Sequence, residues 1–244
     1  MVPELGVAEC HLVRLMIRLR RGPEPTGLAL YSAQWTRRWQ AVHEGRRTGD
    51  WATKSAKDLI SRELRRLTFG KCAFCEGLLE VTSYLEIEHY VAKTLQPDQA
   101  FAWVNLFPIC RLCNNSKGAL DHAGSLIKPD VEDPESLLWL HPDSGELEPK
   151  PRLAAAVRQR VERTIEICDL QRGTLCTKRI QTMQFTIRWL ERLSSAGGGL
   201  DQLLQEEWSL LSDPRAEYKF VIRHVFETRG EPRLAAKDRA NFGM

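Results

Sequence analysis

The sequence predicts an α+β fold in which a small zinc-held module of strands and a short helix lies between N-terminal and C-terminal α-helices. Two cysteine pairs in CxxC spacing, Cys72/Cys75 and Cys110/Cys113, have 34 residues between them. Four thiols match the tetrahedral all-sulfur coordination of structural zinc. On both sides of this stretch apolar residues recur every three or four positions, which is typical of amphipathic helices.

We expect three regions: a basic N-terminal strand and helices over residues 1–67, the zinc module with a following hairpin over 68–150, and a helical region over 151–244. In the N-terminal region a helix begins near Leu28 and another spans about residues 53–68, both with apolar residues on one face. The hairpin is predicted by the turn sequence PDSG between LLWL and ELEP.

The pattern of the C-terminal region predicts four helices. Apolar stripes at helical spacing run over Leu153–Cys168, Ile180–Leu193 and Leu200–Leu211. The last helix is expected to begin with Asp213 as its cap and Pro214 as its first helical residue. We interpret these stripes as core positions and not as cofactor sites.

The composition is that of an ordinary globular protein, with 43% apolar and 27% charged residues. No apolar run approaches the roughly 18 residues of a membrane span. Polar residues interrupt the N-terminus, so a secretory signal is not expected. We therefore expect a cytoplasmic protein without a membrane anchor.

The cysteines favour a reducing compartment. Seven cysteines could form a disulfide framework, but that pattern is typical of short secreted chains, and four of the seven already have metal spacing. Cys10, Cys168 and Cys176 are expected to be free thiols. A redox role for the CxxC pairs is disfavoured, because one metal ion explains two pairs at this distance better.

Positive charge is concentrated in the N-terminal third. Residues 1–67 carry 13 Lys and Arg against 7 Asp and Glu, so their net charge is +6, whereas the remainder has −3. A nucleic-acid partner fits this asymmetry, and a solvated basic face is the alternative. Arg62, Arg65 and Arg66 on the expected second helix are candidate contacts to a DNA backbone.

Between the cysteine pairs stand side chains suited to phosphodiester hydrolysis, which needs a base, a cation and groups that hold phosphate. His89 offers an imidazole that is neutral at cellular pH. Glu88 offers a carboxylate to a hard ion such as Mg²⁺ or Mn²⁺. Strict strand alternation places these two on opposite faces, so both serve one site only if the strand ends or twists there. Glu86 either contacts the residues that bind the metal or is exposed to solvent.

The run NNSKG after the second pair is where a helix can begin. Asn114 and Lys117 are three positions apart and share a helical face, with an amide oxygen for the metal and a cation for the phosphate. The alternative is that Asn114 caps the helix and Lys117 is solvated. Asn105 is expected to form hydrogen bonds that fix its loop against the strand of His89.

These residues together resemble the HNH endonuclease family, in the zinc-stapled ββα-metal variant whose third member is Asn. The resemblance implies that His89 is the general base, that Asn105 is the structural asparagine and that Glu88 and Asn114 hold a catalytic Mg²⁺ or Mn²⁺. Lys117 matches a lysine that often follows the motif. The commoner family residues at positions 88 and 114 are Asp and His, and both departures bear on metal preference.

The flanking stretches resemble one group of HNH proteins, the nuclease subunits of Septu-type anti-phage systems and related retron-linked cassettes. The stretches are RGPEP, GKCAFCE, EHY with Lys93 four positions after the histidine, WVNLFPICRLCNNSKG, the DPE and GELEP hairpin, and TIEICDLQRGTLCTKR, within residues 17–180. The resemblance implies a DNA substrate, which Lys93 would contact, and an ABC or SMC-like ATPase partner that controls the nuclease.

Three functions are thus open. The first is a metal-dependent DNA endonuclease acting in anti-phage defence. The second is a zinc-ribbon module that binds DNA or a partner without cutting. The third is an adaptor that docks an ATPase through its C-terminal helices while the nuclease site is idle.

Overall fold

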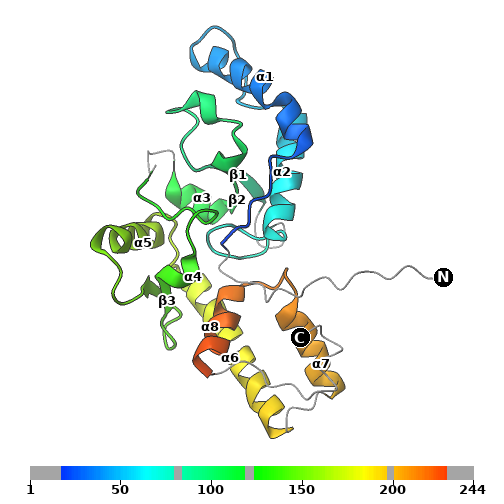
Figure 1. Cartoon of the computed structure of the whole chain (residues 1–244), viewed down its shortest axis with the longest axis vertical. Helices are drawn as coiled ribbons and strands as arrows, with labels where there is room; N and C mark the ends of the chain where they lie inside the picture. Colours follow the sequence, from blue (N-terminus) through cyan, green and yellow to red (C-terminus); the bar gives the residue numbers. More distant parts are fainter. Residues whose placement is uncertain (1–17, 80–83, 119–123, 197–200, 230–244) are drawn as a thin grey trace, which may run out of the picture.

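The computed structural model describes residues 18–79, 84–118, 124–196 and 201–229. Helices dominate these ranges, and two small antiparallel sheets complete the fold (Figure 1). The elements are α1 (Thr26–His43), α2 (Lys54–Thr68), β1 (Leu85–His89), η1 (Pro97–Gln99), η2 (Trp103–Asn105), β2 (Leu106–Cys110), α3 (Arg111–Lys117), α4 (Pro134–Leu137), β3 (Leu138–Leu140), β4 (Leu147–Pro149), α5 (Ala155–Ile167), α6 (Gly173–Ser195), α7 (Gln202–Ser212) and α8 (Lys219–Arg229). The predicted α+β class is confirmed. No helix among the described residues has both the length and the apolar character to span a membrane.

The hairpin of β1 and β2 lies at the middle of the molecule, with α1 and α2 towards one end and α6, α7 and α8 towards the other (Figure 1). The strands pair antiparallel, with Leu85 opposite Cys110 and His89 opposite Leu106. Helix α3 follows β2 without a loop. The hairpin and α3 therefore form a strand–strand–helix unit whose residues reach both flanking helical regions.

Buried side chains on the two sides of β2 belong to different clusters. Leu106 packs with Leu64 of α2, whereas Phe107 packs with Val161 of α5 and Val225 of α8. All five residues of β2 are buried, because helices cover both of its faces. The two larger clusters cross the expected limits at residues 67 and 150, and the division into three domains stays a prediction.

The expected helices and hairpin are present, with one shift in α6. The hairpin is confirmed as β3 and β4, with Leu140 opposite Leu147. On α6, Met183 and Leu193 are buried as expected, but Thr186 and Trp189 are fully buried and the predicted stripe did not include them. Trp189 stacks on Trp208 of α7 at 5.0 Å between ring centroids, so packing against α7 decides which residues of α6 face inward.

The prediction that the last helix begins at Pro214 is wrong, because α8 begins at Lys219. Asp213 accepts a hydrogen bond from the amide of Arg215 at 2.7 Å, which forms a turn in place of a helix cap. The carbonyls of Pro214 and Ala216 accept hydrogen bonds from the Lys71 ammonium at 2.8 and 3.2 Å. These two carbonyls thus hold the Lys71 side chain, which stands directly before the first cysteine pair.

Some expectations fall outside the described residues. They are the expectation that the N-terminus is not a secretory signal and the free thiol expected at Cys10.

Candidate functional site

The four CxxC cysteines form one buried cluster. Cys72 and Cys75 lie in the turn after α2, Cys110 ends β2 and Cys113 lies in α3, and all four sulfur atoms lie within 4.8 Å of one another. The Sγ atoms of Cys75 and Cys110 are 3.7 Å apart. Two sulfurs of a tetrahedral zinc site with Zn–S bonds of about 2.3 Å are about 3.8 Å apart. The cluster is therefore compatible with a structural zinc ion.

The chemistry of this cluster calls for a cation. Burial raises the pKa of the Cys72 thiol, so the protein by itself disfavours its ionisation. A divalent ion would stabilise all four thiolates, as a structural zinc site requires. No cysteine among the described residues forms a disulfide, and the free thiols predicted at Cys168 and Cys176 are confirmed.

The second CxxC pair begins α3 earlier than expected. The helix starts at Arg111 and not at Asn114, because Cys110 is its cap and the Cys110 sulfur accepts a hydrogen bond from the Cys113 amide at 3.5 Å. Asn114 is thus a residue of the helix interior and not a cap. Asn114 and Lys117 both point from α3 towards β1, where they contact Glu86 and Glu88 respectively.

His89 is the last residue of β1, and its ring is held in one orientation. Its Nε2 atom lies 2.9 Å from the carbonyl oxygen of Ala100. A carbonyl can only accept, so Nε2 carries the proton and Nδ1 keeps its lone pair in the neutral ring. Burial, with the positive charge of Lys93, lowers the pKa of His89 to about 3. Because this pKa lies well below cellular pH, His89 is neutral there. The Trp51 ring packs edge to face on the His89 ring, with 4.6 Å between centroids.

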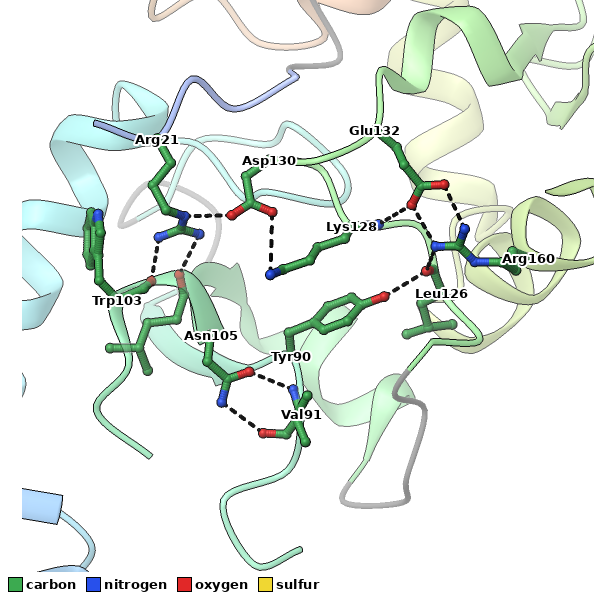
Figure 2. Close-up of polar contacts among 11 residues, drawn as sticks. Arg21, Tyr90, Val91, Trp103, Asn105, Leu126, Lys128, Asp130, Glu132 and Arg160 are labelled. Carbon is green, nitrogen blue, oxygen red and sulfur yellow. Dashed lines mark hydrogen bonds and ion pairs between the residues drawn. The ribbon is translucent and has the colours of Figure 1, made fainter. Parts of the chain in front are cut away.

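Asn105 joins the loop before β2 to the end of β1 (Figure 2). Its Oδ1 atom accepts a hydrogen bond from the amide of Val91 at 2.7 Å, and its Nδ2 atom donates to the carbonyls of Val91 at 3.1 Å and Gln99 at 3.0 Å. The Asn105 side chain is buried. These bonds fix the loop that carries Ala100, and hence the partner of His89.

Two side chains of β1 face two side chains of α3. The Glu88 carboxylate lies 2.5 Å from the Lys117 ammonium, and both are buried. The Glu86 carboxylate accepts a hydrogen bond from the Asn114 Nδ2 atom at 2.5 Å. Glu86 is half-buried and partnered. Spacing along the chain could not show which residue of α3 Glu86 would meet, so its role was open from the sequence.

Glu88 and His89 face different neighbours, as strand alternation predicts: Glu88 faces α3, and His89 faces the loop of Ala100. The positive charges of Lys93 and Lys117 nevertheless act on both of them. Within the described ranges, the four cysteines are the only cluster of His, Cys, Asp and Glu that could hold a metal ion. Any second ion at the described residues would thus have fewer than three ligands from these residue types.

The expected DNA-contacting arginines lie on the exposed side of α2. Arg62 and Arg66 both pair with Glu63, and Arg65 is exposed. Helix α2 packs against both strands of the central hairpin. Lys93 is half-buried, and its ammonium lies 5.7 Å from the centroid of the Trp51 ring, which itself packs on His89. Lys93 thus lies beside the candidate base.

Sequence reasoning missed a buried arginine in the RGPEP stretch (Figure 2). The Arg21 guanidinium forms an ion pair with Asp130 at 2.6 Å and donates to the carbonyls of Trp103 at 2.7 Å and Leu106 at 3.0 Å. It also lies over the Phe107 ring at 4.5 Å from the centroid. Arg21 therefore holds η2 and the start of β2 in place. The only signal in the sequence is the stretch itself, which suggests no physical role for the arginine.

No family model matches the chain. The chain is 25% identical over 221 residues to the Septu protein PtuB of Bacillus thuringiensis, which covers 86% of this chain and 81% of that protein. It is 31% identical over 101 residues to a Septu protein PtuB of Bacillus mycoides (strain KBAB4), which covers 34% of each chain. As the flanking stretches predicted, the chain is similar to a Septu protein PtuB along most of its length.

Proposed function

We propose that the chain is a metal-dependent HNH endonuclease that hydrolyses DNA in a Septu-type anti-phage defence system. The observation that carries this proposal is the state of His89. Its Nε2 atom is bonded to the carbonyl of Ala100, which leaves Nδ1 as a base. A neutral imidazole with one nitrogen fixed and a lone pair on the other can accept a proton from water, as a general base does.

Glu88 and Asn114 would hold the catalytic Mg²⁺ or Mn²⁺. The donor set fits a hard ion, since a carboxylate and an amide oxygen are oxygen ligands. The ammonium of Lys117 already lies 2.5 Å from Glu88, so positive charge is stabilised at this carboxylate. Glu86 holds the Nδ2 atom of Asn114, and the Oδ1 atom of the amide would be the ligand of the ion.

In the proposed reaction His89 takes a proton from water at Nδ1, and the hydroxide attacks phosphorus in line. The bond from phosphorus to the 3′ oxygen breaks, and the leaving oxygen takes a proton from water, which gives 5′-phosphate and 3′-hydroxyl ends. An ion held by Glu88 and Asn114 would stabilise the negative charge on the leaving oxygen. Asn105 keeps the His89 ring in place through the loop of Ala100, and Lys117 would contact a phosphate oxygen.

The substrate and the partner belong to the same proposal. Arg62, Arg65 and Arg66 on α2, with Lys93 beside His89, would contact DNA phosphates independently of sequence. The relatives are named as Septu proteins, and the partner proposed for this chain is an ABC or SMC-like ATPase subunit of such a system. We place the reaction in the cytoplasm.

The test replaces His89 with Ala and, separately, with Gln, which better fills a buried site. We expect each variant to cleave plasmid DNA in Mg²⁺ or Mn²⁺ at least about 100-fold more slowly, because a general base contributes about that much or more. The matched control is His141→Ala, an exposed histidine that should cleave at the parental rate. Circular dichroism checks folding, and a folded His89→Ala that cuts as fast as the parent disproves the assignment.

A second candidate, a zinc module that binds DNA or the ATPase without cutting, is favoured by one observation. Glu88 is already paired with Lys117, and the described residues hold a sulfur cluster as their only group of potential metal-binding acids, thiols and imidazoles. Plasmid incubated with Mn²⁺, with and without the ATPase, separates the two candidates. Cleavage in either mixture excludes the non-cleaving module, and retention of DNA without any cleavage favours it.

A further inference from the structure

The stretch DLQR between α5 and α6 belongs to the motif TIEICDLQRGTLCTKR, and the proposed nuclease reaction does not use it. Helix α5 ends at Ile167, and Asp169 takes a left-handed conformation with φ of 47°. The chain therefore reverses there, and the Leu170 amide donates to the carbonyl of Ile165 at 2.9 Å. Cys168 and Leu170 are fully buried, so this turn packs on the core beside the cysteine cluster.

Side chains other than Arg172 already hold the turn in place from two sides. Gln171 accepts a hydrogen bond from the Leu147 amide at 3.0 Å and donates to the Leu147 carbonyl at 2.7 Å. From α6, Arg179 donates to the carbonyl of Leu170 at 2.8 Å. The backbone at residue 172 is thus held in place, and the direction of its side chain is set.

The Arg172 side chain reaches the sulfur cluster. Its Nη1 atom lies 3.5 Å from the Cys113 sulfur and also donates to the Asp169 carbonyl at 2.8 Å. One Nη1 atom carries two hydrogens and can make both bonds. An arginine guanidinium stays protonated in proteins. Arg172 is therefore charged where its Nη1 atom meets the Cys113 sulfur.

The net charge of a zinc-bound cysteine cluster explains why a positively charged side chain beside it is favourable. Four thiolates around one Zn²⁺ carry a net charge of −2 in a buried site, which is costly without a partner. Lys71 and Arg179 also lie near the cluster, but their donors are bonded to backbone carbonyls. Arg172 has a donor on a ligand sulfur itself, and such outer partners tune metal sites.

We propose that Arg172 is the charge-balancing donor of the zinc site, and that its hydrogen bond to the Cys113 sulfur slows zinc loss and shields that thiolate from electrophiles. Arg172 would not bind zinc. It would act through Cys113 by withdrawing negative charge from a sulfur that zinc shares. This proposal concerns the structural zinc and does not depend on whether the chain cleaves DNA.

The test uses the full chain purified with zinc, without DNA. Zinc release is followed with a chromogenic chelator after addition of a thiol-reactive mercurial or an excess of chelator. We expect Arg172→Gln to release zinc about 10–100-fold faster, which is the usual effect of removing an outer partner of a metal ligand. Arg172→Lys keeps the charge with a different donor geometry, and its rate should fall between those of the parent and Arg172→Gln.

Two further variants separate this role from a merely structural one. Arg163→Gln removes an exposed arginine of the neighbouring α5 and should release zinc at the parental rate. Gln171→Ala loosens the same turn without touching sulfur. In Co²⁺-substituted protein, the thiolate-to-cobalt absorption band should shift in Arg172→Gln and stay unchanged in Gln171→Ala.

A parental release rate in folded Arg172→Gln overturns the proposal, as does a Gln171→Ala variant that matches Arg172→Gln in both release rate and cobalt spectrum. If Arg172→Gln does not fold, Arg172→Lys decides: faster release than the parent supports the proposal, and a parental rate overturns it. Purified parent chain without zinc also overturns it. Because no cleavage is measured, none of these outcomes bears on the nuclease assignment.

Discussion

Helix α3 contributes to two sites that differ in how they are held together. Towards α5 and α6 it presents Cys113 to a cluster of four identical sulfur ligands, all buried. Towards β1 it presents Asn114 and Lys117 to Glu86 and Glu88, so that every group already has a partner of another kind. The sulfur cluster thus consists of four like ligands suited to one metal ion, whereas the carboxylates of β1 already have hydrogen-bond or charge partners.

Because the two sites are held together differently, we expect folding to depend on a metal ion at the sulfur cluster and not at the site of Glu88 and His89. The sulfur site is formed from two chain-local pairs, and a zinc ion bound there would contribute to the folding free energy. The site at Glu88 and His89 is held by protein contacts from Asn105, Ala100 and Lys117. We therefore expect loss of zinc to unfold the chain and loss of a catalytic ion to leave it folded.

The largest effect is expected from Cys72→Ser combined with Cys110→Ser. Apparent zinc-binding free energies of about 10–16 kcal/mol exceed or equal the stability of most domains. The double variant should lose the roughly one zinc per chain expected of a single site and should show no cooperative thermal transition. Elemental analysis and calorimetry measure both quantities, with Cys176→Ser, a free thiol outside the cluster, as control. A double variant that melts like the parent contradicts the structural role of zinc.

A smaller loss of stability is expected at Asn105. Its side chain satisfies the amide and carbonyl of Val91 and the carbonyl of Gln99. Asn105→Ala leaves these groups without their partner, which should lower the free energy of unfolding by about 2–3 kcal/mol. Asn105→Asp keeps the acceptor for the Val91 amide but places a buried carboxylate against the carbonyls of Val91 and Gln99, and should cost at least as much. Urea unfolding measures both, and an unchanged midpoint in Asn105→Ala would show that the loop does not depend on this residue.

Glu86 tests whether the second site binds an ion at all. If Glu86 orients the amide of Asn114, Glu86→Ala should weaken Mn²⁺ binding about 10-fold while the thermal midpoint changes little. Binding can be followed by paramagnetic resonance of Mn²⁺ in zinc-loaded protein. Glu148→Gln, at an exposed position of β4, is the control. Equal Mn²⁺ affinity in the parent, Glu86→Ala and Glu88→Gln would favour the non-cleaving module.

The smallest effect is expected on the surface of α2. Replacing Arg62, Arg65 and Arg66 with Gln should weaken DNA binding and reduce the slope of log affinity against log salt by about 0.9 for each phosphate that is no longer neutralised. The control replaces Arg163, Lys178 and Arg188, which lie on α5 and α6, and should leave the slope unchanged. If both triple variants bind alike, the DNA path does not follow α2.

Some elements of the fold could be predicted because the relevant signals are local. The α2 helix, the β3–β4 hairpin and the free thiols of Cys168 and Cys176 are where periodicity, turn residues and cysteine spacing placed them. The start of α8 could not be predicted, because the carbonyls that would have continued a helix from Pro214 bind Lys71, which is 143 positions away in the chain. Local propensity carries no information on such a partner.

The sequence by itself determined the sulfur cluster, the helical segments and the relation to PtuB, since each depends on residues a few positions apart or on a pattern along the chain. Only the tertiary structure decided that Asn114 meets Glu86, that Lys117 meets Glu88 and that Arg172 reaches Cys113. These interactions join separate elements, and they depend on the register of β1 against α3 and on the turn after α5. A difference of one residue in either would bring other side chains together, because neighbouring positions on a strand or helix point in different directions.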